Sequence, residues 1–507
     1  MRFVVESLYC QKMMDQDSKE YKGIFKSTFL FGFVQVFNIL VKVGLNKVVA
    51  KLIGTEGIGL IGLFNSTINT IQTGAGLGIS QSAVRDISEA NKQNDFNRFS
   101  RVINVTNRVI LFTSLLGIIV TILLSPLLSK AQFGDYSYIL SFVWLSIVVG
   151  LNVLTDGQLA ILKGMRQLRS LAKASMIGSV VGFVTAVPFY FFFGKGGIIP
   201  SLIIAAFSAL FFSNYFVRKI KYNKAILKVK EVLSDSKEMV KMGISLMMVT
   251  FLGYFFDLII SSFISSYGSL SDVGLYHAGT TIITSYFGIV ITAMSTDYYP
   301  RICAVHKDNT ALQGEMNRQS ETGLILIFPL VVLFVFLSPF IIELIYSKDF
   351  APTNMYTDYA MIGTVIIVVS NCMGMILLAK QASKIFLVSV ISQRIILIGV
   401  YIIAYMSLGI LGLGFSYICT GVIHFLFMTF ILNRFYNIRL SKRTFTLLIL
   451  VIIITIMTVF VRKIDYVILK YVLGSLLFVF SCVFSLIYMN KVMDLNILQI
   501  VKSKLKK

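Results

Sequence analysis

Long apolar runs recur along the whole chain and are separated by short polar connections. A helix that crosses a bilayer needs about 20 mostly apolar residues, and many of these runs reach that length. A hydropathy window of about 19 residues predicts about fourteen transmembrane helices. They lie at residues 27–50, 58–80, 102–125, 138–160, 171–193, 197–217, 240–264, 274–296, 320–344, 357–379, 384–407, 410–433, 445–461 and 467–489. The pattern predicts an all-α polytopic membrane protein.

The basic residues between the runs predict the orientation of the chain. Short cytoplasmic connections of membrane proteins carry an excess of Lys and Arg. Here about 35 Lys/Arg, with those of the termini included, fall on one side of the predicted spans and about 8 on the other. We therefore expect both termini to be cytoplasmic.

Two pairs of similar segments predict an internal repeat. Lys163 and Lys380 occupy equivalent places in the similar motifs GQLAILKGMRQLR and GMILLAKQASK. Gly59 and Gly274 do so in EGIGLIG and DVGLYHAG, and nearly the same number of residues separates the members of each pair. Each half would contain six helices, an even number, so both halves would begin on the same side of the membrane and have the same orientation. They would form parallel repeats around a central cavity. The expected division is an N-terminal lobe at 1–217, a cytoplasmic linker at 218–239, a C-terminal lobe at 240–433, and an extra helix pair with a basic tail at 434–507.

Composition excludes several classes of function. The chain has 507 residues, of which 56% are hydrophobic and 14% charged, with a formal charge of +22 and a mean hydropathy of +0.81. Nucleic-acid-binding proteins carry such an excess on a solvated face, whereas here it falls in the loops, so no nucleic-acid partner is expected. The five cysteines show no CxxC spacing, and no GxxxxGK[ST] motif occurs. Neither a metal, a cofactor nor an ATPase domain is expected.

Two cations lie deep within predicted spans. Arg394 sits near the middle of FLVSVISQRIILIGVYIIAYM, and Lys42 lies well inside FLFGFVQVFNILVKVGLNKVV. A charge at that depth costs at least about 2.5 kcal/mol, so it should face a water-filled cavity. Two such cations predict an anionic cargo. Arg108, two turns into its span, and Arg301, after Pro300 at a cytoplasmic end, are weaker candidates for the same cavity.

Acidic and histidine side chains are candidates for ion coupling. Asp257 lies within LGYFFDLIISSF, and His424 lies well inside its span. Asp257 could bind an ion, or it could form an ion pair, for example with Lys42, that only satisfies both groups. His424 could titrate in a proton relay, although a hydrogen-bonded packing role is more common for a lone histidine. Asp156, Asp297 and Glu343 lie near span ends, where a polar group reaches the interface at little cost, so structural roles are expected for them.

Several segments resemble a known family. LVKVGLNKVVAKLIGTEGIGLIGLFNSTINTI and GAGLGISQSAVRDISEANK resemble the opening of bacterial O-antigen flippases, the Wzx-type polysaccharide transporters, including the flippase of the enterobacterial common antigen lipid intermediate. ILKGMRQLRSLAKASMIGSVVG, DVGLYHAGTTI and YYPRICAV resemble the corresponding later spans. The resemblance covers about residues 25–433, and it rests on glycine and packing patterns.

The resemblance implies a member of the multidrug/oligosaccharidyl-lipid/polysaccharide superfamily. Such proteins have two six-helix lobes that open alternately to each side of the bacterial inner membrane. They move an undecaprenyl-diphosphate-linked oligosaccharide across it, without chemical catalysis, for polymerisation or ligation by other machinery outside. Relatives also tend to carry a lysine at the place of Lys42. The last two spans resemble instead the fourteen-helix arrangement of peptidoglycan precursor flippases.

Two other functions remain open from the sequence. A multidrug or cation antiporter of the related extrusion group would carry an acidic residue in its first helix, where this chain has Lys42 and Lys47. An assembly scaffold for polysaccharide-synthesis enzymes would make the cavity residues unimportant. A polymerase or ligase is disfavoured because the connections outside the membrane are short.

Overall fold

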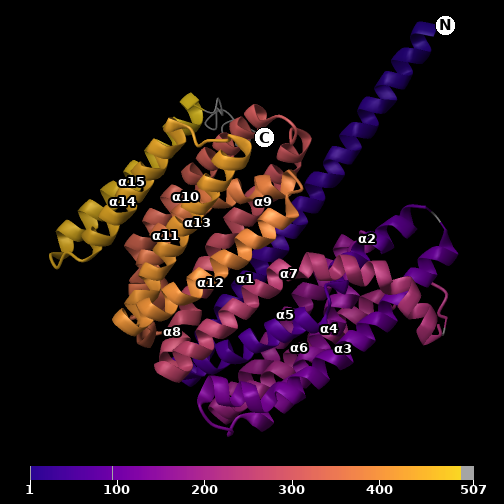
Figure 1. The fold of residues 1–507 in the computed structure, drawn as a ribbon, viewed down its shortest axis with the longest axis horizontal. Helices are drawn as coiled ribbons and strands as arrows, with labels where there is room; N and C mark the ends of the chain where they lie inside the picture. Colours follow the sequence, from indigo (N-terminus) through magenta and orange to yellow (C-terminus); the bar gives the residue numbers. More distant parts are fainter. Residues whose placement is uncertain (1, 94, 226, 493–507) are drawn as a thin grey trace. The chain divides into compact units, whose positions relative to one another are not determined.

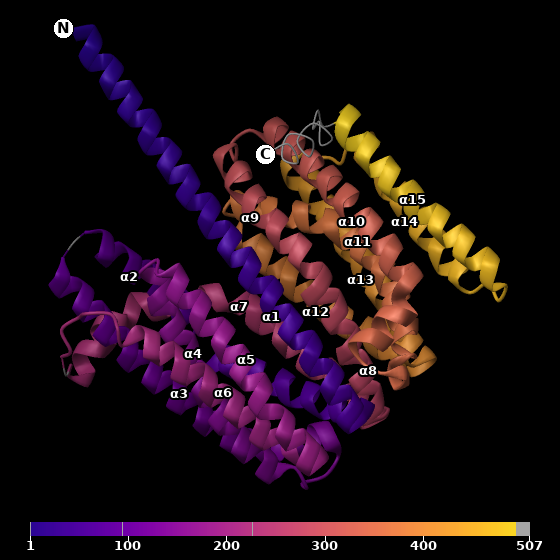
Figure 2. The same ribbon diagram turned by 180° about the vertical axis from the view of Figure 1, so that it is seen from behind.

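The computed structural model describes residues 2–93, 95–225 and 227–492, and in these residues it contains helices and no strands (Figures 1 and 2). The elements in chain order are α1 (Arg2–Ala75), α2 (Ile79–Lys92), α3 (Phe96–Phe133), α4 (Ile139–Gly164), α5 (Leu168–Phe193), η1 (Gly194–Gly197), α6 (Ile198–Val217), α7 (Val229–Tyr267), α8 (Leu270–Thr281), the π-helical turn η2 (Ile282–Phe287), α9 (Gly288–Ala304), α10 (Asn309–Ile345), η3 (Lys348–Phe350), α11 (Thr353–Ala379), α12 (Ser383–Leu408), α13 (Ile410–Tyr436), α14 (Lys442–Arg462) and α15 (Val467–Val492).

The helices form two compact units. The first unit consists of Met1–Ile53 and Phe64–Phe255, and the second consists of Gly54–Leu63 and Phe256–Lys507. Helix α1 contributes to both units, because Gly54 takes a positive φ of 68° and breaks the helix there. The predicted division at residues 217, 239 and 433 stays a prediction beside these observed units.

Ten helices of the described chain are long and apolar enough to cross a membrane, or eleven if the bent pair α8–α9 counts as one span. Large apolar side chains such as Leu123 and Phe192 are each 73% exposed, as expected where lipid rather than water surrounds a helix. The chain is therefore an all-helical, multi-pass membrane protein. The exact number of fourteen spans stays a prediction, because two predicted spans fall on α1 and two others fall on the continuous 50-residue stretch Leu168–Val217.

The backbone repeats at the interval that separates Gly59 from Gly274, which we call the repeat interval. Helices α5 and α12 begin one repeat interval apart, and they also end one repeat interval apart. The turn before each helix contains a left-handed residue at φ 54°, Arg166 in one and Gln381 in the other. The glycine that follows each helix has nearly the same φ and ψ in both (53° and −128°; 58° and −137°). Four consecutive features thus keep one spacing without insertions.

This spacing corrects one sequence alignment. At the repeat interval Lys380 corresponds to Met165, because each is the residue that caps its helix, α11 or α4. Lys163 lies two positions earlier and is not the counterpart of Lys380. The glycine pair Gly59 and Gly274 has the spacing that the backbone follows.

Gly59 of α1 and Gly274 of α8 form a reciprocal close contact within the second unit. A Cβ atom added to Gly59 would lie 2.0 Å from the carbonyl oxygen of Leu270, and one added to Gly274 would lie 2.1 Å from that of Thr55. Thr55 and Leu270 are also one repeat interval apart. Two equivalent segments therefore pack against each other so closely that only glycine fits at either position.

In the second unit α14 packs against α10 and α11, and α15 packs against α10 and α14 (Figures 1 and 2). At one end Arg462 of α14 forms an ion pair with Asp358 of α11, with side chains only 15% and 2% exposed. At the other end Arg443 of α14 lies 3.0 Å from Glu321 of α10, which also accepts a 3.0 Å hydrogen bond from the Tyr488 hydroxyl of α15. Polar contacts thus hold α14 at both of its ends and α15 at one.

Replacing Gly59 by Ala should destabilise the second unit by about 1–3 kcal/mol, because the new methyl group overlaps a backbone carbonyl that is held by its own helix. Thermal unfolding of the purified protein in detergent measures the effect. Gly196→Ala is the control, since no atom lies within 4 Å of the added Cβ there. Equal melting temperatures for the two variants would contradict the close contact.

Replacing Arg462 by Ala should lower the free energy of unfolding by about 3–5 kcal/mol, because it leaves the buried Asp358 carboxylate without its cation. The added change Asp358→Asn should recover part of this loss. The control Lys348→Ala removes a cation from the exposed pair with Glu343 and should change stability by less than about 1 kcal/mol. An Arg462→Ala protein as stable as this control would show that the pair does not hold α14.

Candidate functional site

The first unit contains a cavity of about 490 Å³, lined by both polar and apolar side chains, which we call the Lys42 cavity. Helices α1, α4, α5 and α6 line it, and the small residues Gly178, Gly182, Ala205 and Ala209 leave room between α5 and α6. Its polar lining consists of Gln35, Asn38, Lys42, Asn65, Asn69, Asn152, Thr155, Ser175, Ser179, Tyr190 and Ser201. Among the described residues that line it, none is acidic. The cavity therefore combines one cation with many neutral hydrogen-bonding groups.

Lys42 and Asn38 lie one turn apart on α1. The Asn38 amide nitrogen donates a 3.1 Å hydrogen bond to Ser175 Oγ of α5, while its Oδ1 is buried without a partner in the described chain. The Lys42 side chain is exposed, and no described carboxylate forms an ion pair with it. An exposed ammonium group next to neutral amide and hydroxyl side chains suits a ligand that carries both an anion and hydroxyl groups.

Arg394 lies on α12 in the second unit, in aromatic surroundings. Its guanidinium carbon is 5.1 Å from the centre of the Phe256 ring, against which Tyr401 packs edge-on with ring centres 5.5 Å apart. Within the described residues Arg394 has no ion pair with a carboxylate. A cation–π contact contributes about 0.5–2 kcal/mol, which does not neutralise the charge. Arg394 thus remains available to an anion.

The two predicted ion-coupling residues have neutral partners in the second unit. Asp257 of α7 accepts a 3.1 Å hydrogen bond from the Tyr276 hydroxyl of α8. His424 Nδ1 of α13 lies 2.8 Å from Ser370 Oγ of α11. Each group therefore has a packing partner, and their roles in coupling stay predictions, as does a contact between Asp257 and Lys42.

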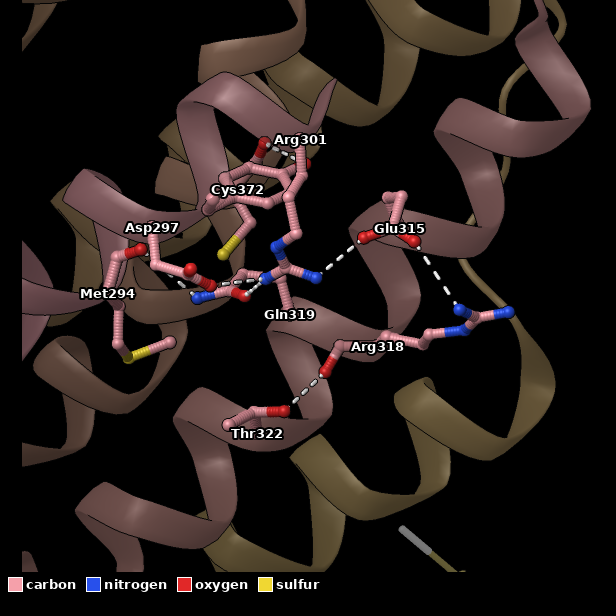
Figure 3. Close-up of polar contacts among 9 residues, drawn as sticks. Met294, Asp297, Arg301, Glu315, Arg318, Gln319, Thr322 and Cys372 are labelled. Atoms are coloured by element: carbon pink, nitrogen blue, oxygen red, sulfur yellow. Dashed lines mark hydrogen bonds and ion pairs between the residues drawn. The ribbon is translucent and has the colours of Figure 1, made fainter. Parts of the chain in front are cut away.

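Arg301 is already paired. Figure 3 shows its guanidinium between Asp297 of α9 and Glu315 and Gln319 of α10, with nitrogen–oxygen distances of 3.0 Å to Asp297 and 2.7 Å to Glu315. An anion would have to compete with two carboxylates for this cation. Arg108 on α3 is half-buried and forms no ion pair with a described carboxylate. Of the four predicted cations, Lys42, Arg394 and Arg108 are thus the ones without an ion pair among the described residues.

Asp156 of α4 lines a second cavity of about 280 Å³ in the first unit, which we call the Asp156 cavity. Its Oδ2 atom accepts a 2.7 Å hydrogen bond from Gln72 Nε2 of α1. Asn69 lines this cavity and the Lys42 cavity. The structural role expected for Asp156 stays a prediction, and the sequence did not show that this side chain lines a cavity. One sequence signal could have indicated this cavity, namely the Asn and Gln residues inside apolar spans, some of which line it together with Asp156.

Comparison with known families identifies the chain. The model of a family described as polysaccharide biosynthesis protein matches residues 48–354. The chain belongs to this family. The predicted resemblance to polysaccharide transporters is thereby confirmed.

Relatives of this polysaccharide biosynthesis protein include the lipid III flippases of Escherichia coli (strain K12) and Shigella flexneri. Each is 22% identical over 405 residues, which cover 76% of this chain and 93% of the relative. Among solved structures, the lipid II flippase MurJ in an inward closed conformation matches 92% of this chain and 99% of its own with a TM-score of 0.68 at 13% identity. An inward-facing multidrug transporter of the MATE family and MOP superfamily matches 82% and 95% with a TM-score of 0.60 at 14% identity. The fold is therefore that of MurJ and the MATE transporters.

Replacing Lys42 by Ala should weaken the binding of a glycosyl diphosphate to the purified protein at least about tenfold. The reason is that a hydrogen bond to a charged group contributes about 1.5–3 kcal/mol of binding free energy. Titration calorimetry measures the affinity. Lys51→Ala is the matched control, since Lys51 is exposed and lies further along α1, about half a turn round the helix from Lys42. An equal loss in both variants would show that only net charge matters.

Proposed function

We propose that this protein is a flippase that moves a lipid-linked oligosaccharide across the bacterial inner membrane. The cargo we propose is an undecaprenyl-diphosphate-linked repeat unit of a surface polysaccharide. The protein carries out no covalent chemistry. It lies in the membrane with both termini in the cytoplasm and crosses it fourteen times.

The observation that carries this proposal is the lining of the Lys42 cavity. Sugars present many hydroxyl groups, which pair with amide and hydroxyl side chains, and a diphosphate needs cations that are not already neutralised. The cavity offers five Asn and Gln side chains and one lysine, with no acidic residue in its described lining. Membership of a polysaccharide biosynthesis family and the similarity to two lipid III flippases support the same cargo class.

In the proposed mechanism Lys42 and Arg394 contact the diphosphate. The glycan occupies the Lys42 cavity, and the prenyl tail stays in lipid, so the polar headgroup never enters hydrocarbon. Because each cation alone contributes a limited attraction, the headgroup can still be released on the far side. Alternating access of the two lobes then exposes the cargo first to the cytoplasm and then to the periplasm. Arg108 and Arg301 stay secondary predictions.

The second candidate is a multidrug or cation antiporter, which the similarity of the fold to MATE transporters favours. An organic cation would need a negatively charged cavity. The Lys42 cavity instead carries a lysine and, among its described lining residues, no carboxylate. The lining therefore supports an anionic cargo over a cationic one.

The proposal predicts that Arg394→Ala abolishes flipping. The assay follows a fluorescent undecaprenyl-diphosphate oligosaccharide in proteoliposomes, where its transfer between leaflets is read by loss of quenching. Arg394→Lys keeps the charge but not the planar fork, so it should retain part of the rate. Arg218→Ala, in an exposed connection, is the control for the loss of one arginine.

Near-normal flipping by Arg394→Ala would exclude the diphosphate contact. Absence of flipping by the wild type, together with uptake of an organic cation, would favour the antiporter. If cavity variants change neither activity while polysaccharide assembly in cells persists, the protein is an assembly scaffold.

A further inference from the structure

Asp156 is a carboxylate without a basic partner in a membrane-spanning helix. It lies well inside the 26-residue helix α4, and its hydrogen-bond partner is the neutral amide of Gln72. Within the described residues no Lys, Arg or His forms an ion pair with it. An unneutralised carboxylate inside a membrane-spanning helix is unfavourable, and one hydrogen bond to an amide offsets only part of that cost.

The surroundings of Asp156 are neutral on every element that lines its cavity. Helix α1 contributes Asn69, Gln72 and Thr73, and α3 contributes Ile110 and Thr113. The residues from α2 are Ile79, Ser80 and Gln81, and those from α7 are Met247, Thr250 and Tyr254. Tyr254 is the one other titratable side chain in this described lining. The charged group with an electrostatic effect on Asp156 is Lys163, about two turns further along α4.

The internal repeat shows that the fold does not require this charge. At the repeat interval Asp156 corresponds to Asn371 of α11, which lines a much smaller cavity of about 10 Å³ in the second unit. The flanking residues also correspond, because Val153 and Gly157 line one cavity and Val368 and Cys372 line the other. The same backbone position is thus filled by a neutral side chain of nearly the same shape.

The two cavities therefore differ in chemistry rather than in construction. Only the first is large enough to hold small ligands or water, and only the first contains a carboxylate among its described lining residues. Side-chain amide and hydroxyl oxygens next to a carboxylate are the ligands that small hard cations prefer. A proton that binds the carboxylate removes the same unfavourable charge. Asn69, which lines both the Asp156 cavity and the Lys42 cavity, connects the two.

We propose that Asp156 is the ion-coupling residue of the transporter and binds one monovalent cation, a proton or Na⁺, in the Asp156 cavity. This inference rests on the proposed flippase function and adds its energy source. Binding neutralises the carboxylate by forming an O–H bond or an ionic contact, and release on the opposite side restores the charge. The ion gradient then supplies a driving force for movement of the lipid headgroup in the opposite direction.

The test measures how far an ion gradient drives the fluorescent lipid-linked oligosaccharide to one leaflet of proteoliposomes. With one ion exchanged per lipid, a tenfold gradient supports a leaflet ratio of up to about tenfold. Separate arms impose a pH gradient and a Na⁺ gradient, which distinguishes the two cations. The wild type should respond to one of them, and Asp156→Asn should give a ratio near one under both.

Two variants serve as comparisons. Asp135→Asn removes one carboxylate from the α3–α4 connection, where hydrogen bonds from Ser137 hold the pKa of Asp135 below its ordinary value, and it should keep the wild-type ratio. Asp257→Asn tests the other candidate carboxylate. A ratio that persists in Asp156→Asn, or that is lost only in Asp257→Asn, overturns the proposal. A wild type that flips the lipid but gives a ratio near one under both gradients also overturns it.

A second measurement does not depend on flipping. A carbodiimide labels protonated carboxyl groups in apolar surroundings, and peptide mass spectrometry locates the label. Labelling at Asp156 that falls with rising pH, or that Na⁺ prevents, is the expected result; no labelling under any condition overturns the site. If the wild type does not flip lipid but Asp156 is labelled in this way, the flippase function fails while the cation site stands. Thermal unfolding of Asp156→Asn confirms that the variant is folded.

Discussion

The high free-energy cost of an unneutralised charge in hydrocarbon is the constraint on which this structure depends. Helices satisfy the backbone hydrogen bonds internally, so the side chains alone decide where polarity is tolerated. Several charged groups of the described spans are neutralised by neighbours, as with Arg462 and Asp358 or Arg301 and Glu315. Lys42, Arg394 and Asp156 are different, because each charge lacks an ion pair among the described residues around it. They are the positions at which a ligand or ion has a reason to bind.

The repeat makes these exceptions easier to interpret. The interval that relates the turns and glycines also relates Lys42 to Asp257 and Ser179 to Arg394. Ser179 lines the Lys42 cavity, while Arg394 contacts the ring of Phe256. The two units therefore share a backbone plan but place their charges at different helices and with different signs. The backbone plan is common to both units, whereas each unpaired charge occurs in only one of them.

Much of this fold follows from the sequence, because hydrophobic spans, basic loops and paired glycines are local signals. The glycine pair at Gly59 and Gly274 predicted the spacing of the repeat, whereas the lysine pair was displaced by two positions because basic residues near a helix end resemble each other at several alignments. Lys42 and Arg394 could be found as isolated charges in apolar runs.

The position of Asp156 beside a cavity could not be found in this way, because its closeness to a span end indicated the membrane interface. Only the packing of α1 against α4 shows that it faces a cavity with Gln72. The partners of Arg301 on α10 were equally hidden, because they come from another helix.

The reciprocal contact between Gly59 and Gly274 has the form of an isologous interface. The carbonyl of Thr55 lies against Gly274, and the equivalent carbonyl of Leu270 lies against Gly59. The two equivalent segments therefore present the same surface to each other, and that surface is complementary to itself. Such self-complementarity is what two-fold symmetric dimers require. A half-length chain carrying this surface could have associated with a second copy of itself, and fusion into one chain would have freed the two copies to diverge. The neutral Asn371 at the position equivalent to Asp156 is a difference that two identical copies cannot have.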